Sequence, residues 1–185
     1  MKRINKLSTI LTGILEVFHW VGAALMAAAA VCSVAAPQWI GYFVSFDAKA
    51  CCGAELAVYG FEVNAAVADG KVDMTTFFLF GIGAVIILAV MALVFRNLHL
   101  IFKESQNASP FQKDNICRCK TIGFLSIAVP VIGFVMSVIT RLVIGAEAAQ
   151  IRVSQSGIFM GIIVLCLTQF FIHGAALEND VDGLL

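Results

Sequence analysis

The sequence predicts an all-α membrane protein, a bundle of four transmembrane helices with a small β-hairpin-like segment outside the cytoplasm between the first two helices. Two observations predict this fold class. Of the 185 residues, 61% are hydrophobic and 13% charged, whereas in soluble domains about a quarter are charged. The apolar residues also gather into four long runs without Asp, Glu, Lys or Arg, at residues 17–46, 74–95, 121–140 and 153–177. Each run is long enough to cross a bilayer, which takes about 20 residues.

The four runs are predicted to be helices within one domain that covers residues 1–185. They lack the alternation of a membrane β-barrel, and a backbone in lipid must satisfy its own N–H and C=O groups. The first helix is expected to end before Pro37, and Pro130 is expected to kink the third. The predicted spans are residues 9–36, 74–102, 110–144 and 154–177, with an outer segment at 37–73.

The outer segment has the composition of a small β-hairpin. Residues 56–63 are rich in strand-forming side chains, and residues 68–71 read Ala-Asp-Gly-Lys. An Asp-Gly pair tolerates positive φ and is typical of a tight turn.

The third helix has a clear predicted start. In the run Ser109-Pro110-Phe111-Gln112, Ser is suited to the N-cap, Pro to the first helical position and Gln to the return bond of a capping box. A helix that begins at Pro110 starts about ten residues before its apolar core. Leu98, Ile101 and Phe102 also continue the second helix past its apolar run. The two helices are therefore expected to project from the membrane as a basic hairpin.

The charges predict the orientation. Four cations lie on one side of the spans, at Lys49, Lys71, Arg141 and Arg152, and eight on the other, at Lys2, Arg3, Lys6, Arg96, Lys103, Lys113, Arg118 and Lys120. By the positive-inside rule the side with eight cations is cytosolic. We therefore expect a multi-pass protein of the cytoplasmic membrane with both termini in the cytosol. The 12 Lys and Arg balance the 12 Asp and Glu, which argues against direct binding of nucleic acid.

Residues 109–123, from Ser-Pro-Phe-Gln to Thr-Ile-Gly, resemble the second cytosolic loop of an uncharacterised bacterial family of four-span membrane proteins, catalogued as a domain of unknown function. The chain departs from the pattern at Cys119, where Leu is usual, and in its last residues, Val181 to Leu185. Members of the family are often encoded beside a small helix-turn-helix regulator. The resemblance therefore implies a membrane anchor or regulator of such a factor.

The capped, basic, protruding start of the third helix is the predicted partner-binding surface. Its residues are Pro110, Phe111, Lys113, Asn115, Arg118 and Lys120.

Polar residues within the spans form a second candidate site toward the cytosolic side. They are paired at helical spacing, as Glu16 with His19, Arg96 with His99, and Gln169 with His173. Charges inside a span usually face the bundle interior, so one hypothesis is a Glu16–Arg96 contact lined by the three histidines. The alternative, which the closeness of each residue to a helix end favours, is that these side chains reach to the membrane interface.

The same histidines raise the possibility of haem or metal ligation. The sequence lacks histidines paired at one depth and a zinc-type spacing, so we expect no metal and no cofactor. It also contains no nucleophile triad, phosphate-binding loop or paired catalytic carboxylates, so an enzyme is not expected.

Two functions remain as hypotheses. The first is a sensory or regulatory membrane protein that engages a cytosolic partner, such as a small transcription factor, through the hairpin of the second and third helices. The alternative is a small transporter or channel subunit, which would require a homo-oligomer because four spans enclose little water.

Overall fold

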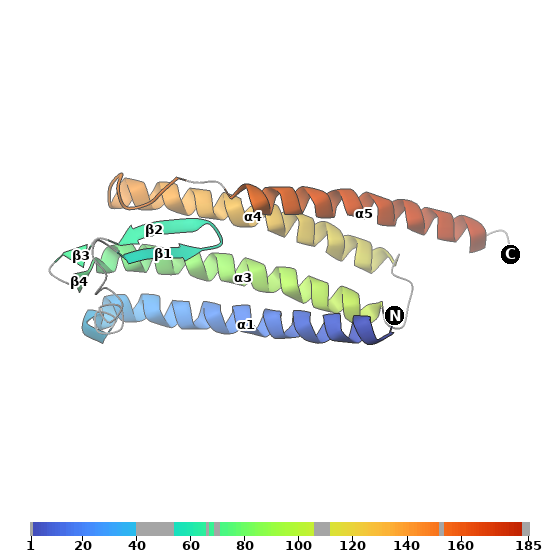
Figure 1. Ribbon diagram of the computed structural model, residues 1–185, viewed down its shortest axis with the longest axis horizontal. Coiled ribbons are helices and arrows are strands. Elements are labelled where there is room, and N and C mark those ends of the chain that lie inside the picture. Colours follow the sequence, from blue (N-terminus) through green and yellow to red (C-terminus); the bar gives the residue numbers. More distant parts are fainter. Residues whose placement is uncertain are drawn as a thin grey trace. The chain divides into compact units, whose positions relative to one another are not determined.

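Four long helices dominate the computed structural model, which describes residues 2–39, 54–65, 67–68, 71–105, 112–151 and 154–182 (Figure 1). The helices are α1 (Lys2–Ala35), α3 (Met74–Glu104), α4 (Lys113–Val143) and α5 (Gln155–Asp182). Between α1 and α3 lie the strands β1 (Ala54–Val58), β2 (Phe61–Ala65), β3 (Val67–Ala68) and β4 (Lys71–Val72).

All four helices are long and apolar enough to cross a membrane. They indicate a multi-pass membrane protein, as predicted from the apolar runs. Large apolar side chains are exposed along α1 and α5 above all, including Phe18, Leu25 and Phe170. Such faces are stable in contact with lipid tails and would be unfavourable in water.

The helix ends differ from the predicted ones. α1 begins at Lys2 rather than at residue 9, because residues 2–8 contain no Gly or Pro and continue the helix. α3 runs to Glu104, two residues past the predicted end. α5 continues to Asp182 rather than ending at residue 177, so the helix includes much of the acidic tail.

A hairpin is present in the predicted outer segment, with a turn that the sequence did not indicate. Residues 56–63 do not form one strand: β1 and β2 pair antiparallel, from Ala54 with Ala65 to Val58 with Phe61. The chain reverses at Tyr59 and Gly60, which both have positive φ (45° and 86°), as a two-residue type I′ loop requires. The expected Asp-Gly turn at residues 69–70 lies outside the described residues, although β3 and β4 pair on either side of it.

The chain falls into two compact units. Unit 1 comprises Met1–His19, Val90–Ala128 and Gln155–Leu185, and unit 2 comprises Trp20–Ala89 and Val129–Ser154. In α4 the boundary between the two units falls between Ala128 and Val129. The expected kink at Pro130 stays a prediction, and so does the assignment of one domain.

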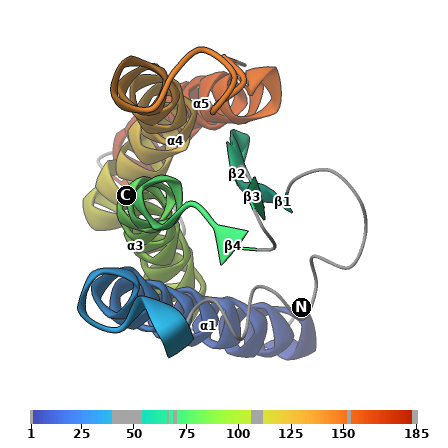
Figure 2. The same ribbon diagram turned by 90° about the vertical axis from the view of Figure 1, so that its left-hand side faces the viewer.

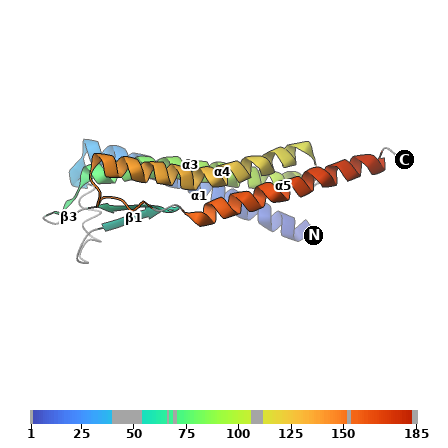
Figure 3. The same ribbon diagram turned by 90° about the horizontal axis from the view of Figure 1, so that it is seen from above.

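In unit 2 the β1–β2 hairpin packs on one side of α3 and α4 (Figures 2 and 3). Phe61, at the start of β2, is fully buried and stacks on Phe80 of α3 with ring centroids 5.6 Å apart. Gly83 makes room for it, since a Cβ there would lie 2.6 Å from the Phe61 ring, and the backbone of α4 approaches at Gly133, where a Cβ would make an ordinary contact at 3.6 Å from the Phe61 Cβ. Phe61 thereby anchors the hairpin against both helices.

The segment that leaves α4 runs back along the same hairpin. The Asn64 N–H donates to the carbonyl of Ala148 at 2.8 Å, and Val63 forms a bridge with Ala149. At the tip, a Cβ on Gly60 would lie 2.8 Å from that of Ser154. The hairpin is therefore held by the α4–α5 connection as well as by the helices.

Asp73 caps the start of α3. Its carboxylate accepts hydrogen bonds from the N–H groups of Thr75 and Thr76, at 3.3 and 3.1 Å, and from the Thr76 hydroxyl. The Thr76 hydroxyl contributes most to lowering the pKa of Asp73 below its ordinary value, because these bonds favour the charged carboxylate.

In unit 1 the helices pack as successive neighbours. α1 contacts α3 at Thr9 and His99, α3 contacts α4 through an ion pair, and α4 crosses α5 at two glycines. At this crossing, a Cβ on Gly161 would lie 2.8 Å from the carbonyl oxygen of Gly123. The two backbones approach closely because neither residue has a side chain.

Candidate functional site

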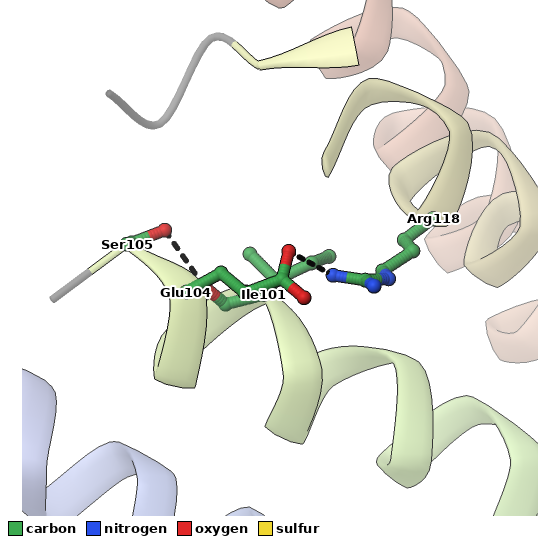
Figure 4. A network of polar contacts seen from close by, with 4 residues as sticks. All are labelled: Ile101, Glu104, Ser105 and Arg118. Carbon is green, nitrogen blue, oxygen red and sulfur yellow. Dashed lines mark hydrogen bonds and ion pairs between the residues drawn. The ribbon is translucent and has the colours of Figure 1, made fainter. Parts of the chain in front are cut away.

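The end of α3 and the start of α4 are joined by an ion pair between Glu104 and Arg118 (Figure 4). Both side chains are partly exposed, so water screens the ion pair and it contributes little to stability. The Ser105 hydroxyl donates to the Ile101 carbonyl at 2.7 Å and closes the last turn of α3. We call Ile101–Ser105 and Lys113–Lys120, taken together, the α3–α4 end.

Three lysines are exposed at the α3–α4 end, namely Lys103, Lys113 and Lys120. Arg118, predicted to bind a partner, has its guanidinium on Glu104 within the chain. Lys113 and Lys120 present their charges to the surroundings, so they fit the predicted role better than Arg118 does.

Asn115 differs from the other predicted partner-binding residues because it is buried, with 2% of its surface exposed. Neither its Oδ1 nor its Nδ2 has a hydrogen-bond partner. A buried amide without partners costs about 1–3 kcal/mol, and such groups are rare in folded proteins. The α3–α4 end therefore contains an amide whose two donors and two acceptor positions are unused.

The remaining predicted partner-binding residues, Pro110 and Phe111, lie outside the described residues, together with Ser109 of the expected capping box. The described helix begins at Lys113, and Asp114 in its first turn complements the positive end of the helix dipole.

His99 fastens α1 to α3. Its Nδ1–H donates to the carbonyl of Thr9 at 2.9 Å. Gly13 allows this approach, since a Cβ there would lie 3.1 Å from His99 Nδ1. The contact forms one wall of an open groove of about 450 Å³, lined by Thr9, Ile10, Gly13, Ile14, Val17 and His99.

His19 lies in the same helix pair and is buried, with 4% of its surface exposed. Its Nδ1–H donates to the carbonyl of Leu15 at 2.7 Å, and its ring packs on Phe95 of α3 with centroids 4.8 Å apart. His19 and His99 therefore both serve the packing of α1 on α3.

The other members of the predicted polar cluster have different surroundings. Glu16 is half-buried, whereas Arg96, Gln169 and His173 are exposed. Among the described side chains, an ion pair forms between Glu104 and Arg118. The contact between Glu16 and Arg96 stays a prediction. Among the described residues, no group of three His, Cys, Asp or Glu side chains could hold a metal ion.

Sequence reasoning missed the α1–α3 groove. The signal was present, because Lys6, Ile10, Gly13, Ile14 and Val17 recur at intervals of three and four and share one helix face. What the sequence did not reveal is that α3 contributes His99 to the same surface.

No protein-family model matches the chain, and neither does a curated protein or a solved structure.

Proposed function

We propose that this chain is a regulatory protein of the cytoplasmic membrane that binds a cytosolic protein through the α3–α4 end. The observation that carries the proposal is the buried, unpartnered amide of Asn115, in the stretch of α4 that also carries the exposed Lys113 and Lys120. An amide that donates and accepts at once complements a peptide backbone, and the lysines complement an acidic surface. A partner that engages both would relieve the cost of the unpaired amide after a small local rearrangement.

The charge distribution supports the cytosolic placement. Eight of the twelve Lys and Arg residues lie on the side of the α3–α4 end, and this excess faces the cytosol in multi-pass proteins. Both termini would then be cytosolic as well, since the described residues contain an even number of candidate spans.

The resemblance at residues 109–123 supports a small helix-turn-helix regulator as the partner. The chain itself would not touch nucleic acid, because its positive and negative charges balance. No reaction is assigned to it, so its output would be the retention or release of the partner. The transport alternative requires Glu16, His19 and Arg96 to line one path, and no observation on the described residues favours it.

Site-specific photo-crosslinking in living cells tests the proposal. A photoreactive amino acid at position 113 or 120 should form an adduct with one soluble protein. The same group at Leu142, which is exposed near the opposite end of α4, should not form that adduct. Adducts at 113 and 120 that contain only lipid or other copies of the chain would refute a cytosolic protein partner.

A charge reversal provides a second arm. Lys113→Glu with Lys120→Glu should abolish the adduct formed from a crosslinker at Gln112, which is exposed. Arg141→Glu, the matched reversal at the other end of α4, should leave the adduct unchanged.

A further inference from the structure

The α1–α3 groove is lined mostly by apolar residues. Four of its six lining residues, Ile10, Gly13, Ile14 and Val17, are apolar, and Thr9 and His99 use polar atoms to hold the two helices together. Ile10, Ile14 and Val17 are exposed, so the groove opens to the medium that surrounds the helices.

The register of the two helices places a lysine from each at the same end of the groove. Within unit 1, His19 meets Phe95 while Thr9 meets His99, so α1 and α3 run antiparallel. Lys6 lies three residues before Thr9 and Lys103 four residues after His99. At about 1.5 Å per residue, both lie about 5 Å beyond the His99 contact in the same direction. Both side chains are exposed.

We propose that the groove binds an anionic phospholipid, with an acyl chain along Ile10, Ile14 and Val17 and the phosphate between Lys6 and Lys103. This site shares Lys103 with the α3–α4 end, but it uses none of Lys113, Lys120 and Asn115, on which the proposed protein partner rests.

The dimensions fit one lipid of one leaflet. From Lys6 to Val17, α1 rises about 16 Å, which is close to half of the ~30 Å hydrocarbon layer. The groove volume of about 450 Å³ lies in the range of about 300–1,000 Å³ that small-ligand sites occupy.

Charge complementarity selects the headgroup. Two ammonium groups at the mouth of an apolar groove match a phosphate that carries a net negative charge, whereas a zwitterionic headgroup brings a cation of its own. Basic sites beside membrane helices are known to select anionic lipids in this way. A helix of a second copy would fill the apolar part but would leave both lysines without a counter-charge.

Quenching of a single tryptophan by brominated lipids tests the site. In a chain with Trp20→Phe and Trp39→Phe, a single tryptophan is introduced by Val17→Trp or by Phe18→Trp. Val17 lines the groove, whereas Phe18 is similarly exposed but does not line it. Each protein is reconstituted into phosphatidylcholine vesicles that contain an increasing fraction of either phosphatidylglycerol or phosphatidylcholine with brominated acyl chains.

At position 17, the apparent affinity obtained from the quenching curve should be at least fivefold higher for brominated phosphatidylglycerol than for brominated phosphatidylcholine. At position 18 the two lipids should give the same quenching curve. Lys6→Gln and Lys103→Gln should each reduce the preference by about fivefold, the effect of one cation near an anionic lipid surface. Lys120→Gln, an exposed lysine of α4, should not change it.

Several results would overturn the proposal. These are the same preference at positions 17 and 18, no preference at position 17, or a preference that survives Lys6→Gln with Lys103→Gln. A Val17→Trp reporter that neither lipid quenches would show that protein, such as a second copy, covers the groove. All the substituted lysines are exposed, so an unchanged far-UV circular dichroism spectrum verifies that each variant is folded.

Discussion

At the scale of single residues, Asn115 links stability to the proposed function. Asn115→Leu replaces the unpartnered amide by an apolar group of similar size. It should raise the free energy of unfolding in detergent by about 1–3 kcal/mol, the cost of an unsatisfied buried amide. It should also abolish the adduct formed from position 113.

The matched control is Asn97→Leu, because the Asn97 Nδ2 donates to the Leu93 carbonyl at 2.8 Å and is satisfied. That variant should not gain stability. If Asn115→Leu is less stable than the parent, then the amide is satisfied in the folded protein and the argument for a partner at this residue is wrong.

Two glycines are expected to respond to alanine in opposite ways. Gly161→Ala places a methyl group 2.5 Å from Ile127 Cγ1 and 2.8 Å from the Gly123 carbonyl oxygen, so α4 and α5 must move apart. Overpacking of this kind costs about 1–3 kcal/mol of stability. In Gly22→Ala the new methyl group would contact only Leu88 Cδ1, at 3.7 Å, so this variant should be as stable as the parent or slightly more stable. Thermal unfolding of both variants in the same detergent measures the difference, and equal effects would contradict the close crossing.

At the scale of elements, the cap of α3 gives a pH dependence. The pKa of Asp73 is lowered in the folded protein from its ordinary 3.8. The cap therefore contributes its full stability above about pH 4 and loses it as the pH falls through the lower, folded-state pKa.

Asp73→Ala should lower the free energy of unfolding near neutral pH by about 0.5–2 kcal/mol, the usual value of an N-cap. Asp73→Asn keeps a capping oxygen but does not ionise, so it should stay within a few tenths of a kcal/mol of the parent and lose the acid dependence. Unfolding curves between pH 2 and 7 in a detergent without ionisable groups measure both effects. An Asp73→Ala variant with the acid dependence of the parent would show that another group causes it.

The elements also show how far sequence reasoning reaches. The four spans were predictable because lipid demands long uninterrupted apolar runs, a constraint that a sequence displays directly. The reversal at Tyr59 was not, because tyrosine rarely adopts positive φ and the hairpin is fixed by the burial of Phe61 against α3 and α4. That packing depends on contacts between residues distant in sequence, which a local pattern does not contain.

The candidate site was predictable in part for a similar reason. Charge and helix spacing singled out Lys113, Lys120, His19 and His99 before any contact was known. They could not show that Arg118 is engaged by Glu104 or that Asn115 is buried, because both depend on how α4 packs against the rest of the chain.

At the scale of the whole molecule, the distribution of apolar surface separates two kinds of helix. About two fifths of the most apolar window is buried in α3 and α4, but only 22% in α1 and 11% in α5. The outward faces of α1 and α5 are therefore where lipid or another copy of the chain would contact the protein, and a homo-oligomer stays a prediction for these faces.

Cysteine labelling in intact cells tests the central claim, a four-span protein whose α3–α4 end faces the cytosol. In a chain without its native cysteines, Lys113→Cys probes that end, and Glu147→Cys probes the connection between α4 and α5, where Glu147 is exposed. A membrane-impermeant maleimide should label position 147 in intact cells and position 113 only after the cells are opened. Labelling of position 113 in intact cells, or of both positions from the same side, would contradict the account.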